Sequence, residues 1–126
     1  MNMILAIAAG GAIGAVLRHY VGILAISLTG MTFPWGTLSV NILGSFLMGA
    51  LITYFANAWN PAPEIRGFLT VGLLGAFTTF STFSLDAVTL YERGALMASM
   101  GYILASVVLS IGALFAGMAL LRQFVL

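Results

Sequence analysis

The sequence predicts an all-α membrane protein of four transmembrane helices, with the third helix broken near its middle. The hydrophobic share of the chain, its shortage of charge and its length predict this class. Of the 126 residues, 62% are hydrophobic and only 6% are charged, and the mean hydropathy is +1.16, whereas soluble domains carry roughly 25% charged residues. One span takes about 20 apolar residues, so residues 1–126 have room for four spans in a single membrane domain.

The first two predicted helices cover about residues 3–28 and 37–55. The opening of the first lacks a basic region, and Arg18 and His19 lie towards its far end. We therefore expect this helix to be mature structure rather than a cleaved signal peptide. Residues 30–36, with the sequence GMTFPWG, separate the two helices, because glycine and proline interrupt helical patterns.

The other two predicted helices cover about residues 68–91 and 96–124. The stretch 57–67, which contains two prolines, precedes the third helix, and a polar Glu-Arg-Gly turn at 92–94 precedes the fourth. Aromatic side chains that favour the headgroup layer fall near the predicted ends; they are Trp35, Tyr54, Trp59 and Tyr91. The boundaries therefore rest on two independent signals.

The middle of the third helix is unusual. Residues 72–84 read GLLGAFTTFSTFS, in which glycines are followed by five hydroxyl residues and three phenylalanines. Irregular backbone at membrane depth is tolerated only where protein or water covers it. We expect a break at residues 75–79, buried in an assembly.

The arginines are distributed evenly between the two predicted sides. If the termini share one side, it carries Arg66 and Arg122, while the other carries Arg93 and the intramembrane Arg18. Orientation follows the excess of Lys and Arg in cytoplasmic loops, and here that excess is zero. The chain is therefore expected to insert both ways and form an antiparallel homodimer, a closed two-fold assembly. A weak bias set by His19, the N-terminal amine or an auxiliary factor is the alternative.

Small residues recur four positions apart, which lets helix backbones approach closely in lipid. The pairs are Gly10 with Gly14, Gly11 with Ala15, and Ser45 with Gly49. We assign them to helix packing and not to chemistry.

Polar groups inside the predicted spans are functional candidates, because each costs a few kcal/mol to insert. Arg18 could snorkel to the interface, form a structural hydrogen bond, or present a positive field to a vestibule. Asn41 lies about one turn inside the second helix, with Thr37 four residues earlier on the same face. Its amide could form an interhelical hydrogen bond or coordinate an anion.

Two further patterns could line a path for a small anion. Phe80 and Phe83 share a helix face beside Thr79 and Thr82, and aromatic ring edges carry partial positive charge. One polar stripe marks the fourth helix at every fourth residue, namely Tyr102, Ser106 and Ser110. Packing alone would explain the phenylalanine pair, and a seam against another helix would explain the stripe.

Several functions are disfavoured by what the sequence lacks. Cysteine is absent and histidine occurs once, so thiol catalysis and histidine metal clusters are excluded, and we expect neither an enzyme nor a nucleic-acid partner. The third helix carries Asp86 near its end, and no carboxylate lies at the centre of a span, which weakens a small dual-topology proton-coupled cation exporter. An accessory subunit whose polar stripes bind helices is the other alternative.

Taken together, these residues resemble those of the Fluc (CrcB-type) family of small fluoride channels, and the resemblance covers nearly the whole chain. The motifs that carry the resemblance agree in order and spacing. They are Gly-Ala-Val-Leu ending at Arg18, GTLSVN at 36–41 with Gly44, TTFSTFS at 78–84, and the Tyr102, Ser106 and Ser110 stripe.

The resemblance implies passive export of toxic cytoplasmic fluoride across the bacterial inner (plasma) membrane, through two pores of an antiparallel, dual-topology homodimer. Arg18 would contribute to the positive field of the vestibule. The pore residues implied by matching positions are Thr37, Asn41, Phe80, Ser81, Thr82, Phe83, Tyr102, Ser106 and Ser110. The partners expected are thus fluoride, a second copy and the lipid bilayer.

The resemblance also implies a structural Na⁺ at the centre of the dimer interface, held by the backbone carbonyls of Gly75 and Thr78 from both subunits. Two positions depart from the family pattern. Ala76 stands where a second glycine is expected, and Asp86 is shorter than the glutamate often found there. The effect of Ala76 on the cation site and the role of Asp86 are left open.

Overall fold

The computed structural model describes residues 2–126, which form helices and short connections without a strand. The elements in chain order are α1 (Met3–Thr29), α2 (Trp35–Asn57), α3 (Pro63–Gly67), the π-helical η1 (Phe68–Leu74), α4 (Gly75–Phe77), α5 (Phe80–Glu92) and α6 (Leu96–Val125). Four helical segments are long and apolar enough to cross a membrane: α1, α2, the run Pro63–Glu92, and α6. The prediction of four spanning helices in an all-helical chain is confirmed.

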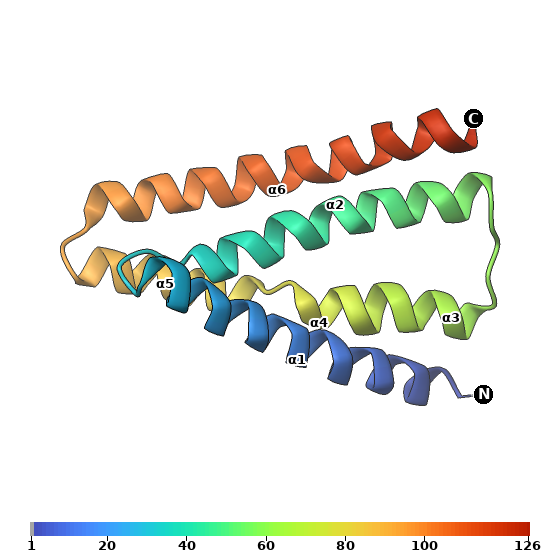
Figure 1. Cartoon of the computed structure of the whole chain (residues 1–126), viewed down its shortest axis with the longest axis horizontal. Helices are drawn as coiled ribbons and strands as arrows, with labels where there is room; N and C mark the ends of the chain where they lie inside the picture. Colours follow the sequence, from blue (N-terminus) through green and yellow to red (C-terminus); the bar gives the residue numbers. More distant parts are fainter. Residues whose placement is uncertain (1) are drawn as a thin grey trace.

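The four spans run alongside one another, with both ends of the chain at the same end of the bundle (Figure 1). The α2–α3 connection lies at this end as well, and the α1–α2 and α5–α6 connections lie at the other. Arg66 and Arg122 therefore lie at the end with the termini, and Arg93 lies at the opposite end.

The third span begins at Pro63, five residues before the predicted start at 68. Proline is tolerated in the first turn of a helix, because its missing N–H would have no partner there. The predicted start at residue 68 is therefore wrong for residues 63–67, where the proline belongs to a helix and not to a loop.

Each of the first two spans packs mainly on the span that comes two later in the chain: α1 packs on η1 of the third span, and α2 packs on α6. A side chain at Gly10 or Gly14 would overlap the backbone of η1, and one at Gly49 or Gly117 would overlap the backbone of the facing helix. The close helix packing predicted for Gly10, Gly14 and Gly49 is confirmed. α6 and η1 both pack on α2, but no Cα atom of α6 lies within 8 Å of one in η1.

A buried apolar cluster lies at the end of the bundle that carries the α5–α6 connection. Its members come from α2, α5 and α6, and they are Leu38, Phe83, Ala87, Leu90 and Tyr102. Outside this cluster many large apolar side chains are exposed, and only 11% of the most apolar stretch of α6 is buried. Lipid or a further protein surface must therefore cover most of this helix.

Candidate functional site

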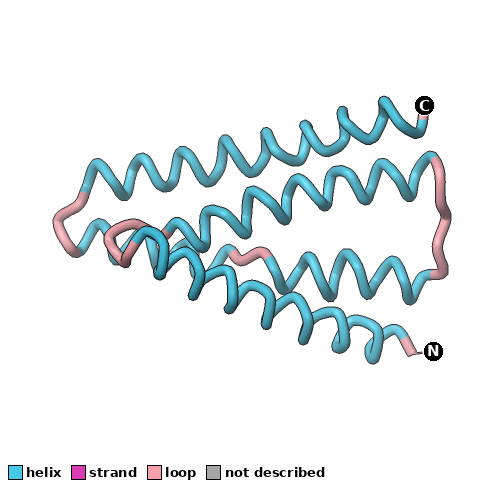
Figure 2. Tube along the Cα trace, viewed as in Figure 1, coloured by secondary structure: helices cyan, strands magenta, loops and turns pink. Residues whose placement is uncertain are grey.

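Helical backbone is interrupted in the middle of the third span, where Thr78 and Thr79 are extended (Figure 2). The Thr79 N–H donates to Asn41 Oδ1 at 2.8 Å, and Asn41 Nδ2 donates to the Thr79 carbonyl at 3.0 Å. The Asn41 amide thus pairs with both backbone groups of one extended residue, as a neighbouring strand would. A side chain at Gly44 would overlap the Thr78 side chain, so glycine there allows this close approach.

The interruption redirects hydrogen bonds away from two carbonyls. In a continuous α-helix the Thr79 N–H would donate to the Gly75 carbonyl, and the Thr82 N–H to the Thr78 carbonyl. Here the first N–H donates to Asn41, and the second donates to Thr79 Oγ1 at 3.2 Å. The Gly75 and Thr78 carbonyls are therefore released from these helical bonds; Gly75 lies in the short helix α4 just before the interruption, and Thr78 is its first residue.

A cavity of about 300 Å³ lies beside the interruption, between α2, α5 and α6. We call it the polar pocket, and its lining residues are Asn41, Ser45, Thr78, Thr79, Phe80, Phe83, Ser106, Val107, Ser110 and Ile111. It brings together five of the residues that the sequence singled out as pore candidates. No carboxylate and no basic side chain is among its lining.

Two hydroxyl groups of the polar pocket have no partner. Ser106 Oγ and Ser110 Oγ are buried, and among the described residues nothing forms a hydrogen bond with either. Leaving a buried hydroxyl unpaired costs about 1–3 kcal/mol, so such groups call for a bound water or ion. Ser106 and Ser110 of the α6 stripe are therefore not joined to α2 or α5 by hydrogen bonds.

The two phenylalanines of α5 have different surroundings. Their ring centroids lie 5.4 Å apart with the rings tilted by 52°. Phe83 is buried and also packs against Tyr102, whereas the Phe80 side chain is 78% exposed. Phe80 therefore projects from the protomer at the mouth of the polar pocket.

Other candidate residues lie outside the polar pocket. Arg18, Thr37 and Thr82 line a separate cavity of about 400 Å³ between α1, α2 and α5. Arg18 Nε donates to the Ala76 carbonyl at 3.1 Å, and its Nη1 donates to Thr82 Oγ1 at 3.4 Å. Arg18 therefore binds the interrupted span from the α1 side and does not snorkel to the interface.

Ser81 and Tyr102 also lie outside the polar pocket. Ser81 is exposed, and its hydroxyl lies 3.5 Å from Thr79 Oγ1. Tyr102 is completely buried and donates its hydroxyl to Asp86 Oδ2 at 3.1 Å. The α6 stripe thus ends at a carboxylate whose role the sequence left open.

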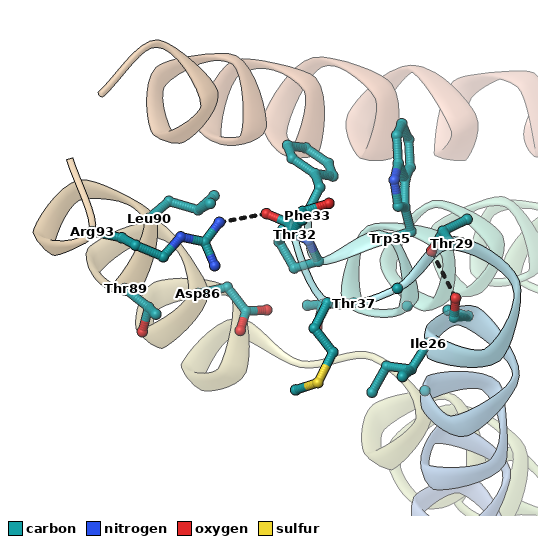
Figure 3. A pocket seen from close by; sticks show the side chains of 16 residues that line it. Ile26, Thr29, Thr32, Phe33, Trp35, Thr37, Asp86, Thr89, Leu90 and Arg93 are labelled. Carbon is teal, nitrogen blue, oxygen red and sulfur yellow. Dashed lines mark hydrogen bonds between the residues drawn. The ribbon is translucent and has the colours of Figure 1, made fainter. Parts of the chain in front are cut away.

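A third cavity, of about 220 Å³, lies at the end of the bundle that carries Arg93. Its wall is formed by the α1–α2 connection together with Thr37 of α2 and Asp86 of α5. Figure 3 shows the Asp86 and Arg93 side chains directed towards this connection, where Arg93 donates to the Thr32 carbonyl. Sequence reasoning missed this cavity, because its walls come from segments about 50 residues apart.

The model of the family described as CrcB-like protein, Camphor Resistance (CrcB), matches residues 5–118. The chain belongs to the CrcB family. The resemblance stated from the motifs of the sequence is confirmed by this match.

Relatives of this CrcB-family chain are similar over almost their whole length. The fluoride-specific ion channel FluC of Agrobacterium fabrum is 59% identical over 117 residues, covering 93% of this chain and 94% of the relative. The protein of the same name from Rhodospirillum centenum is 54% identical over 125 residues, 99% of both chains. That from Rhizobium meliloti is 52% identical over 125 residues, 99% of this chain and 100% of the relative.

Membership of the CrcB family separates the alternatives left by the sequence. Its relatives carry the name of an ion channel, not that of an enzyme, a cation exporter or an accessory subunit.

Proposed function

We propose that this CrcB-family protein is a fluoride channel of the bacterial inner membrane, which lets toxic fluoride leave the cytoplasm by passive electrodiffusion. The observation that carries the proposal is the identity of 52–59%, over nearly the full length, with relatives named fluoride-specific ion channels. The polar pocket supports it independently, because hydroxyl and amide donors suit a small anion.

The donors of the polar pocket would replace the water around the ion. Ser106 and Ser110 offer unpaired hydroxyls, and Asn41 Nδ2 has a second hydrogen besides the one given to Thr79. The edges of Phe80 and Phe83 add weak positive charge. Neutral donors bind an anion more weakly than a cationic side chain would, which allows the ion to leave again.

An antiparallel homodimer with two pores would complete this path. Phe80, which is exposed in the single chain, would then contribute its ring edge to a pore shared with the second copy. The distribution of arginines supports insertion in both directions. Arg18 bonds at mid-span and no longer counts towards either side. The loops and ends then carry Arg66 and Arg122 against Arg93, an excess of one positive charge in place of the zero counted from the sequence.

A structural Na⁺ at the dimer centre is the remaining part of the proposal. Gly75 and Thr78 from both copies would hold it through their backbone carbonyls, and hard cations prefer oxygen ligands. The release of these two carbonyls from helical hydrogen bonding fits this role. When bound, the ion would supply positive charge between the two pores. The Ala76 carbonyl would not compete for the ion, because it already accepts a hydrogen bond from Arg18 Nε.

Efflux from vesicles tests the proposed function. Purified protein is reconstituted into liposomes loaded with potassium fluoride, and a K⁺ diffusion potential is set with valinomycin. We expect fluoride to leave electrogenically without a proton gradient. Fluoride retention equal to that of protein-free vesicles would contradict the proposal, and so would efflux that requires a proton gradient.

Ser106→Ala combined with Ser110→Ala is expected to slow fluoride efflux without destabilising the protein. Removing two unpaired buried hydroxyls removes a desolvation cost of about 1–3 kcal/mol each, so the thermal midpoint should stay or rise. The same change deletes two donors from the ion path. Thermal unfolding in detergent and liposome efflux measure the two effects. Ser27→Ala is the control, because Ser27 lies on α1 and lines none of the cavities described above. A lower midpoint would show that these hydroxyls are structural.

A further inference from the structure

An apolar groove of about 340 Å³ lies between α2, η1 and α6, towards the end of the bundle that carries the termini. Its lining consists of Leu47, Ala50, Leu51, Tyr54, Leu69, Leu73, Leu74 and Leu121. It exists because α6 and η1 each pack on α2 while their Cα atoms stay more than 8 Å apart. Helix packing inside the protomer therefore leaves this furrow unfilled.

The groove and the polar pocket lie on different sides of α2. Leu47 and Tyr54 follow Gly36 by 11 and 18 residues, close to three and five whole turns, so all three share one side of the helix. Gly36 contacts α1 on that side. Asn41 of the polar pocket is rotated from Gly36 by about 140°. A second copy seated over the polar pocket, as the proposed function requires, would therefore leave the groove facing lipid.

A cationic side chain, that of Arg66, follows the outer end of this groove, one helical turn beyond the lining residue Leu69. Arg66 precedes the lining residue Leu69 by three residues, and its guanidinium lies 4.6 Å from the ring centre of Phe55, next to the lining residue Tyr54. Its one hydrogen bond to a side chain is a long one of 3.4 Å to Asn60 Oδ1. Within residues 2–126, most of the five guanidinium N–H donors therefore have no acceptor, and Arg122 follows the lining residue Leu121 at the same end.

We propose that this groove binds one acyl chain of a glycerophospholipid, whose phosphate is held by Arg66. An apolar furrow that faces lipid and ends at an arginine matches the two chemical parts of such a molecule. Arginine is suited to the phosphate because its planar donors match phosphate oxygens. The bound lipid would fill the space between α6 and η1 and so join the two helix pairs of the protomer.

Native mass spectrometry of the full-length protein, delipidated in mild detergent, tests the proposal. Phosphatidylglycerol, phosphatidylcholine, diacylglycerol and inorganic phosphate are added separately. We expect both phospholipids to bind, diacylglycerol to bind more weakly because it lacks the phosphate, and inorganic phosphate alone not to be retained.

Two variants and one control separate the parts of the site. Arg66→Gln should weaken phospholipid binding at least about fivefold through loss of a charge-assisted contact. Arg93→Gln makes the same change at the other end of the bundle and should leave binding unchanged. Ala50→Leu adds three carbons inside the groove and should also weaken binding. If Ala50→Leu does not fold, the comparison of Arg66→Gln with Arg93→Gln still decides, since neither adds bulk.

Equal binding by Arg66→Gln and Arg93→Gln would overturn the proposal, and so would equal binding of diacylglycerol and phospholipid. A groove filled by a second copy would retain no lipid, which would overturn it as well. Fluoride efflux is measured on the same proteins. Arg66→Gln should conduct like the unmodified protein, so a failure of lipid binding is distinguishable from a failure of the proposed function.

Discussion

Asn41→Asp is expected to slow fluoride efflux on the order of a hundredfold. A carboxylate at this position would place negative charge beside the anion path. At an effective dielectric constant of about 20 and a separation of roughly 5 Å, two like charges repel by about 3 kcal/mol, which corresponds to a rate factor of about 150. Aspartate can accept from the Thr79 N–H, but it cannot donate to the Thr79 carbonyl as the amide does. The initial rate of electrode-detected efflux measures the effect.

Asn57→Asp is the matched control for this variant. Asn57 is also on α2, and its Nδ2 donates to the Thr53 carbonyl at 2.9 Å, but it lies at the end of the helix away from the polar pocket. We expect its efflux rate to stay within about twofold of the unmodified protein, because an exposed charge at this distance is screened. Similar rates for the two variants would argue that Asn41 does not lie beside the ion.

Gly117→Ala is expected to lower the free energy of unfolding by about 2–3 kcal/mol, although it adds a single methyl group. The added carbon would overlap the Phe46 carbonyl oxygen and approach the Ala50 backbone nitrogen. Both are backbone atoms of α2, so no side-chain rotation can make room, and α6 must move outward. Close backbone approach is the main attraction between helices in lipid, and that approach would be lost.

Gly112→Ala is the control, because it lies on the same helix and a side-chain carbon there meets nothing within 4 Å. It should be neutral or stabilising by up to about 1 kcal/mol, since alanine favours helix over glycine. Denaturant or thermal unfolding in the same detergent, followed by tryptophan fluorescence, compares the two. Equal midpoints would mean that α2 and α6 do not pack through Gly117.

The helical segments could be predicted from the sequence because bilayer thickness imposes a length on each apolar run. Gly, Pro and aromatic residues predict the helix ends to within a few residues. The exception is the third span, which begins at Pro63 although the prolines around it indicated a loop. Gly10, Gly14 and Gly49 could also be recognised as packing glycines, since a spacing of four depends on one helix alone, whereas Gly44 and Gly117 could not.

The contacts that define the candidate site could not be derived in the same way. The sequence position of Asn41 allowed two interpretations, an interhelical hydrogen bond or an ion ligand. The observed pairing with Thr79 joins residues 38 positions apart, which no local pattern indicates. Likewise, nothing local indicated that Tyr102 would donate to Asp86 or that Arg18 would meet the Ala76 carbonyl. Such contacts depend on how helices are placed around one another, which hydropathy and spacing do not determine.

The alternating pairing of the spans has a consequence for how the protein is made. Because α1 packs on η1 and α2 on α6, the main partner of each of the first two spans is made two spans later. The glycine face of α1 therefore remains exposed to lipid while α2 is synthesised. The face of α2 that packs on α6 likewise remains exposed until α6 leaves the ribosome. A nascent chain ending before α6 would hold only one of its two main pairings, so membrane quality-control proteases would meet the unpaired α2 in every truncated product.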